Sequence, residues 1–165
     1  MTDTTLTPSR LWKRMTAEQR LRAAQALWRE REAAGEQMQA ALLIAKQRNF
    51  RPKTVVGLDN DRKARHLAGV SDLSDEFAAR VLLIYHLAEQ RPMMGAFLDA
   101  HGIAHDDGLI REDAAAPDPA KTAAAAATIA RAYPAHDVAL YLNTLLSQDP
   151  KAWATLHDVP EARLP

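Results

Sequence analysis

The chain has 165 residues, of which 47% are hydrophobic, 25% are charged and 5% are aromatic, and its formal charge at pH 7 is zero. This is the length and composition of one globular domain whose core is mainly aliphatic. Because there is no cysteine, disulfides, thiolate nucleophiles and cysteine-ligated metal centres are excluded, and no apolar run approaches the roughly 20 residues that span a bilayer.

The first residues, Met1-Thr2-Asp3-Thr4-Thr5, are polar and lack the apolar stretch of a signal peptide. We therefore expect a cytoplasmic protein with no membrane association. The preference for Arg and Ala over Lys is typical of GC-rich bacterial genomes.

The first 68 residues carry signals for five helices. Thr7-Pro8 is a cap followed by a proline at the first helical position, and Thr16 with Gln19 is a capping box. Gly35 is expected to end the second helix. The predicted helices cover residues 8–14, 17–32, 36–48, 52–56 and 60–68. In the third, Met38, Leu42 and Ala45 share one face, so we expect this helix to be central.

The rest of the chain carries four or five further helical segments. Ser74 caps a strongly periodic helix over residues 75–90, and Arg91-Pro92 interrupts it before a second helix that ends at Gly102. Residues 103–117 have turn chemistry at Asp106-Asp107-Gly108 and no apolar period. Helices over 118–133 and 135–148 follow, and Pro150 opens a short terminal helix.

This pattern predicts an all-α fold, either a compact multi-helix bundle or a short stack of helical hairpins, with about eight helices and no sheet. Residues 1–165 form a single domain. Within it we expect a basic amino-terminal subdomain, 8–102, and a carboxy-terminal helical subdomain, 117–158, joined by the loop 103–117.

The neutral total hides an uneven distribution of charge. Residues 1–65 contain fourteen Lys or Arg and seven Asp or Glu, whereas residues 66–165 contain seven and fourteen. Such a dipolar chain favours association, either between its own two halves or with another molecule. Docking of the basic residues against the acidic half is the simpler expectation.

The positive charge is densest in residues 46–65. This segment holds seven basic residues against two acidic ones, and the basic residues are Lys46, Arg48, Arg51, Lys53, Arg62, Lys63 and Arg65. A helix, a connection with a proline and a second Arg-rich helix resemble the outline of a helix-turn-helix, in which basic side chains hold phosphates. The segment is therefore a candidate interaction patch for a protein partner or, alternatively, for nucleic acid.

A second candidate surface surrounds the Arg91-Pro92 break. Tyr85, Met93, Met94 and Phe97 bring aromatic rings and flexible thioethers together at helical spacing. Such residues suit an adaptable groove for an apolar helix or peptide. They equally suit an ordinary core.

Metal-ligating residue types gather at His101, His105 and Asp106. In an all-α protein the His105-Asp106 pair resembles the histidine–aspartate pair of the HD-domain phosphohydrolases, and the resemblance implies that His66 and Asp137 would complete the ligand set. The alternative is an aspartate-rich surface turn, since Asp107-Gly108 follows the pair.

No catalytic or cofactor motif is present. The serines lie at caps, turns or helix ends and outside any Gly-x-Ser-x-Gly elbow, and the glycine-rich loops that hold nucleotide phosphates are missing. We therefore expect no cofactor and a non-catalytic helical interaction module, an adaptor or scaffold. The alternatives are a nucleic-acid-binding protein acting through residues 46–65 and a metal-dependent phosphohydrolase of the HD type.

Overall fold

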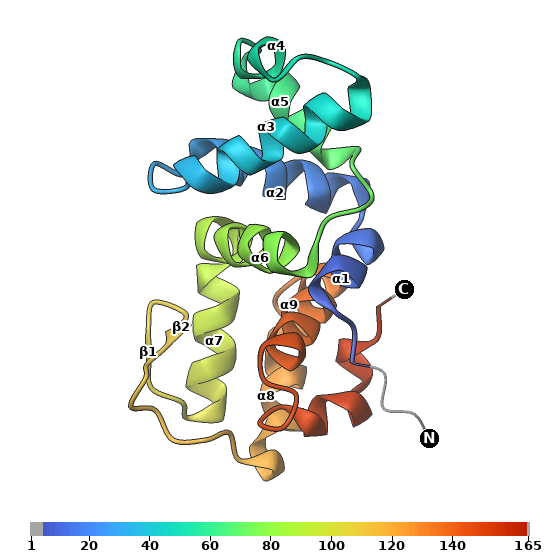
Figure 1. The fold of residues 1–165 in the computed structure, drawn as a ribbon. Helices are drawn as coiled ribbons and strands as arrows, with labels where there is room; N and C mark the ends of the chain where they lie inside the picture. Colours follow the sequence, from blue (N-terminus) through green and yellow to red (C-terminus); the bar gives the residue numbers. More distant parts are fainter. Residues whose placement is uncertain (1–4, 165) are drawn as a thin grey trace.

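The computed structural model describes residues 5–164, so Met1–Thr4, on which the expected lack of a signal peptide mainly rests, lie outside it. Almost all of the regular secondary structure of the described chain is helical, which confirms the predicted all-α class (Figure 1). The elements are α1 (Pro8–Arg14), α2 (Ala17–Arg29), α3 (Ala34–Arg48), α4 (Pro52–Val56), α5 (Asn60–Ala68), α6 (Asp75–Glu89), α7 (Arg91–His101), β1 (His105–Asp106), β2 (Leu109–Ile110), α8 (Pro119–Ala130), α9 (Ala135–Gln148), and the 3-10 helices η1 (Ala154–Asp158) and η2 (Pro160–Ala162).

Side-chain caps begin most of the amino-terminal helices where the sequence predicts. The hydroxyls of Thr7, Thr16 and Ser74 accept hydrogen bonds from backbone N–H groups in the first turns of α1, α2 and α6, and Thr16 forms the full capping box. The expected role of Gly35 was wrong. It lies inside α3, and α2 already ends at Arg29.

The expectation of no sheet was also wrong, because β1 and β2 form a small antiparallel hairpin within residues 103–117. Its loop is Asp107-Gly108, and both residues have positive φ, 50° and 93°. Two central residues with positive φ define the type I′ turn, which Asp-Gly favours and whose twist matches that of paired strands. The turn chemistry was thus recognised correctly, but the paired strands were not.

The core consists of two clusters of buried hydrophobic residues that separate near Gln90. The first gathers α1 to α6, and the second gathers α7, α8, α9 and the carboxy-terminal segment. The break at Arg91-Pro92 therefore divides the core, whereas the sequence places the subdivision at the loop 103–117. Leu140 of α9 is buried in the first cluster and links the two.

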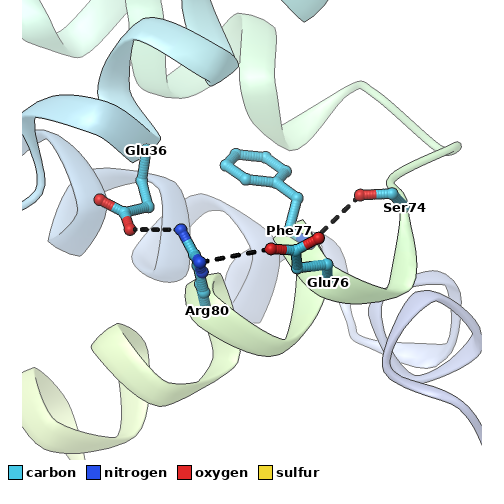
Figure 2. A network of polar contacts seen from close by, with 5 residues as sticks. All are labelled: Glu36, Ser74, Glu76, Phe77 and Arg80. Atoms are coloured by element: carbon cyan, nitrogen blue, oxygen red, sulfur yellow. Dashed lines mark hydrogen bonds and ion pairs between the residues drawn. The ribbon is translucent and has the colours of Figure 1, made fainter.

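Arg80 links α6 to α3, two helices of the first cluster (Figure 2). Its guanidinium lies 3.1 Å from the carboxylate of Glu36 on α3 and 3.3 Å from that of Glu76 on its own helix. The arginine side chain is half exposed, so each ion pair is worth at most about 1 kcal/mol. The Arg80–Glu36 pair therefore links the first turn of α3 to α6 and adds little to stability.

The predicted central position of α3 was wrong. Its buried residues are Ala40, Ala41, Ile44 and Ala45, while Met38 and Leu42 are 52% and 51% exposed. The helix packs through a face made of three alanines and Ile44, and it leaves Met38 and Leu42 exposed on another face. Figure 1 shows α3, α4 and α5 at one end of the molecule and α8 toward the other. Within residues 5–164, no helix combines the length and apolar character needed to cross a membrane.

Candidate functional site

The outward face of α3 carries an apolar stripe that ends in a positive charge. Met38, Leu42 and Lys46 are spaced by four residues, which places them on one side of an α-helix, and all three are exposed. The opposite face, with Ala40 and Ile44, is fully buried. The stripe is therefore not part of the core.

The connection to α4 continues this mixture of apolar and basic residues. Asn49 ends α3 in the left-handed conformation with φ 56°, and Phe50 then lies edge-on against the ring of His66 on α5 while remaining 40% exposed. Pro52 starts α4, which buries Val55 and leaves Val56 49% exposed. We call the exposed residues of α3, the connection and α4 the α3–α4 surface: Met38, Leu42, Lys46, Arg48, Phe50, Arg51, Lys53 and Val56.

The seven basic residues predicted as an interaction patch fall into two groups. On α5, Arg62 and Arg65 pair with Asp59 and Asp61 at 3.6 and 2.9 Å, and the ammonium of Lys63 lies 5.1 Å from the ring centre of Trp28. The other four, Lys46, Arg48, Arg51 and Lys53, are exposed, and no acidic residue among 5–164 forms an ion pair with them. The unpaired charge is therefore concentrated on the α3–α4 surface.

Docking of the basic segment onto the acidic half of the chain was a wrong expectation. Among the described residues, the ion pairs of residues 46–65 stay within the Asp59–Arg65 stretch. Lys13, which lies outside the basic segment, does pair with a later acid, Asp72, at 3.1 Å. The helices that carry the basic segment, α3 to α5, lie at one end of the molecule, and α8 lies toward the other (Figure 1).

The proposed groove residues are mostly core. Tyr85, Met93 and Phe97 are completely buried, and their rings and thioethers pack inside the two clusters. Met94 alone of the four lies at the wall of a surface pocket, between α6, α9 and the hairpin. The sequence pattern could not separate a groove from a core, and the structure assigns three of the four residues to the core.

The metal candidates have other partners. The Nε2 atom of buried His101 lies 3.0 Å from the hydroxyl of Thr122, and that of His105 lies 2.7 Å from the carboxylate of Asp99. Asp106 pairs with Arg111 at 3.0 Å. Within residues 5–164, no group of three or more potential ligands is close enough to hold a metal ion.

The HD resemblance also fails in its geometry. The pair expected in a core helix, His105-Asp106, instead forms strand β1. Asp137 on α9 accepts a hydrogen bond from the amide of Gln19 at 2.9 Å, and His66 lies against Phe50. The four residues implied as ligands are therefore not brought together.

Sequence reasoning missed the apolar part of the α3–α4 surface. Met38 and Leu42 were assigned to a buried face because their spacing matches a helix that packs against neighbours. The available signal was the second stripe on the same helix, Ala40, Ala41, Ile44 and Ala45, which the structure shows to be the packed one. No protein-family model matches the chain. No curated protein and no solved structure matches it either.

Proposed function

We propose that this protein is a non-catalytic interaction module that binds an acidic, amphipathic helix of a partner protein through the α3–α4 surface. The observation that carries the proposal is the exposure of Met38 and Leu42 on the same helix face as Lys46, followed in the chain by three further exposed cations that have no acidic partner in residues 5–164. Apolar and unpaired cationic groups side by side complement an apolar and acidic partner.

The apolar residues would supply most of the affinity. Complete burial of a Leu or Met side chain contributes roughly 1.5–3 kcal/mol, so covering the exposed half of each would add about 1 kcal/mol per residue. Exposed charge pairs contribute less, about 0.2–1 kcal/mol each, and mainly raise the association rate. Binding should therefore weaken with salt without disappearing.

A helical partner suits the shape of this surface. Residues four apart on α3 form a ridge along the helix, and such a ridge packs into the groove of another helix. A partner helix with apolar residues at i, i+3 or i+4 and i+7 would cover Met38 and Leu42, and its flanking Asp or Glu residues would reach Lys46, Arg51 and Lys53.

The same observations disfavour nucleic acid. In a helix-turn-helix arrangement α5 would be the reading helix, but Arg62 already pairs with Asp59, which caps that helix, and Arg65 pairs with Asp61 in its first turn. A phosphate backbone would also leave Met38 and Leu42 uncovered, because phosphate contacts are made by charged and polar groups.

The test uses displayed random peptides selected for binding to the purified full-length protein. We expect the enriched peptides to combine Asp or Glu with apolar residues at helical spacing. Their affinity should fall at least tenfold for the double variant Met38→Ser, Leu42→Ser. The control variant Leu109→Ser removes a similarly exposed leucine from the hairpin and should leave binding unchanged.

Three outcomes would contradict the proposal. Peptides without acidic residues, or peptides that bind the double variant as well as the wild type, would exclude this surface as the site. Tight binding of duplex DNA or RNA that is lost in Lys46→Glu, Arg51→Glu would assign the cations to nucleic acid. Concentration-dependent self-association lost in that same variant would identify a second copy as the occupant.

A further inference from the structure

A pocket away from the α3–α4 surface opens between α6, α9 and the hairpin. Its volume is about 220 Å³. Met94, Tyr141 and Leu145 form buried walls, and the exposed side chains of Leu83, Leu109 and Ile110 surround its mouth. The remaining residues that line it are His86, Gly108, Thr144 and Gln148.

His86 lines this pocket and has a buried ring nitrogen without a hydrogen-bond partner in residues 5–164. Its side chain is 2% exposed, and its Nδ1 atom lies 2.8 Å from the carbonyl oxygen of Leu82. Because a carbonyl can only accept, Nδ1 carries the proton and Nε2 presents a free lone pair. Nε2 has no hydrogen-bond partner within the described part of the chain. Burial lowers the pKa of His86 to about 4, so the ring is neutral at physiological pH.

Neighbouring groups hold the imidazole in place and do not compete for its lone pair. Its ring centre lies 5.3 Å from that of Tyr85 and 5.8 Å from that of Tyr141. The hydroxyl of Thr144 donates to the carbonyl of Leu140 at 2.7 Å. No Asp, Glu, Lys or Arg of residues 5–164 lines the pocket, and burial raises the pKa of Tyr141, which keeps its hydroxyl neutral. The pocket therefore suits an uncharged occupant.

The outer wall is pre-formed because the hairpin is held firmly against α7. The guanidinium of Arg91 donates to the carbonyl of Asp107 at 2.9 Å, and the backbone N–H of Gly108 donates to Nδ1 of His105 at 3.0 Å. A Cβ atom at Gly108 would come within 3.0 Å of Cβ of Met94 and 3.2 Å of the carbonyl oxygen of Arg91. This close approach fixes Leu109 and Ile110 at the mouth of the pocket.

A bound water satisfies such a site poorly, because buried waters usually have two to four polar partners and the walls here are mostly hydrocarbon. An aromatic ring fits better. An apolar protein cavity of about 150 Å³ can hold benzene, so this larger space accommodates a ring with a substituent. The thioether of Met94 and the ring of Tyr141 are favourable neighbours for an aromatic group.

We propose that this pocket binds a small neutral aromatic molecule that carries one hydroxyl or N–H group, of the phenol or indole class, and that this group donates a hydrogen bond to Nε2 of His86. The site is independent of the α3–α4 surface. Its ligand is selected by shape and by one donor, with no contribution from charge.

The experiment compares phenol with toluene, which has a similar size and lacks the donor. Binding to the isotope-labelled full-length protein is measured by NMR titration. We expect saturable shifts at pocket residues with both probes and about fivefold tighter binding of phenol. In His86→Phe, which keeps a ring and removes the acceptor, this preference should disappear. In Leu83→Ser, a variant of the pocket mouth, both probes should weaken and the preference should remain.

If His86→Phe does not fold, a measurement on the wild type alone still tests the hydrogen bond to Nε2. The ¹⁵N resonances of His86 should report a protonated Nδ1 before titration, and Nε2 should shift on saturation with phenol but not with toluene. No saturable binding of phenol, equal affinity for the two probes, an unchanged Nε2 resonance or a preference that survives in His86→Phe would each overturn the proposal.

Discussion

The indole N–H of Trp12 on α1 donates a hydrogen bond to the carbonyl oxygen of Val70, 58 residues later, at 2.7 Å. Trp12 is completely buried, and Val70 lies in the connection between α5 and α6. The bond satisfies a buried carbonyl at a point where the chain has left helix α5. It ties the first helix to the connection that leads into α6.

Replacing this tryptophan tests the bond. In Trp12→Phe the carbonyl of Val70 loses its partner and a small cavity forms, so we expect a loss of roughly 2–4 kcal/mol in the free energy of unfolding. The measurement is urea denaturation followed by circular dichroism. Trp153→Phe is the control, because no hydrogen bond of its indole is found within residues 5–164, and it should cost less. Equal losses would mean that the bond contributes nothing specific.

His86 should make stability depend on pH. Burial is the main cause that lowers its pKa from 6.5 to about 4, and the Leu82 carbonyl and the charge of Asp137 oppose it only in part. The unfolded chain therefore takes up a proton between pH 6.5 and 4 while the folded chain does not. Stability is complete above pH 6.5 and falls as the pH drops toward 4, by about 3 kcal/mol in all.

The His86 contribution is isolated by comparing variants over the same pH range. His86→Phe should lose this part of the slope, whereas His136→Gln, a change at an exposed histidine, should retain it. Urea midpoints measured from pH 4 to 7 give the comparison. A slope that is identical in wild type and His86→Phe would show that His86 is not held neutral by burial.

Truncating side chains on the exposed face of α3 should change the free energy of unfolding little, whereas truncation on the buried face should lower it strongly. Met38→Ser and Leu42→Ser each remove a half-exposed side chain and should change the free energy of unfolding by less than about 0.5 kcal/mol. Ile44→Ala leaves a cavity in the first core cluster and should cost about 2–5 kcal/mol. Thermal and urea denaturation of the three variants measure these changes in the free energy of unfolding. A large loss from Leu42→Ser would mean that the stripe packs within the molecule.

Two glycines should respond in opposite directions to alanine. Gly108 has φ 93° and lacks room for a Cβ beside Met94, so Gly108→Ala should destabilise the protein by about 1–3 kcal/mol. Gly35 lies in α3, and an added Cβ there would meet nothing within 4 Å. Gly35→Ala should therefore stabilise by roughly 0.5–1 kcal/mol. Calorimetric melting temperatures would reveal the two signs, and a neutral Gly108→Ala would show that the turn relaxes easily.

Local signals in the sequence predict the elements well. Thr16 with Gln19, Ser74, Pro92 and Gly102 mark helix ends through bonds and backbone angles within a few residues, and the structure places helix boundaries at or next to them. The two hairpin strands were not predicted because a strand of two residues is too short to show an alternating pattern. The Asp107-Gly108 loop was the only local sign of pairing.

Which face of a helix is buried depends on its neighbours, and this could not be predicted for α3. The helix has one stripe with Met38 and Leu42 and another with Ala40 and Ile44, and either fits helical periodicity. The structure buries the alanine-rich stripe. Whether Lys46 and Nε2 of His86 find a partner likewise depends on what the fold brings near them, and within residues 5–164 neither has one. Candidate sites were therefore predicted less well than helices.

The separation of the core near Gln90 leaves two clusters of buried side chains that share the helix α9. Leu140 of α9 is buried among residues of α1 to α6, while its helical neighbours Tyr141, Leu142 and Leu145 belong to the other cluster. Local opening of either half must therefore disturb α9, which couples the stabilities of both. Tyr141 and Leu145 also line the pocket that contains His86. A molecule bound there would therefore contact α9 and stabilise the packing between the two core clusters.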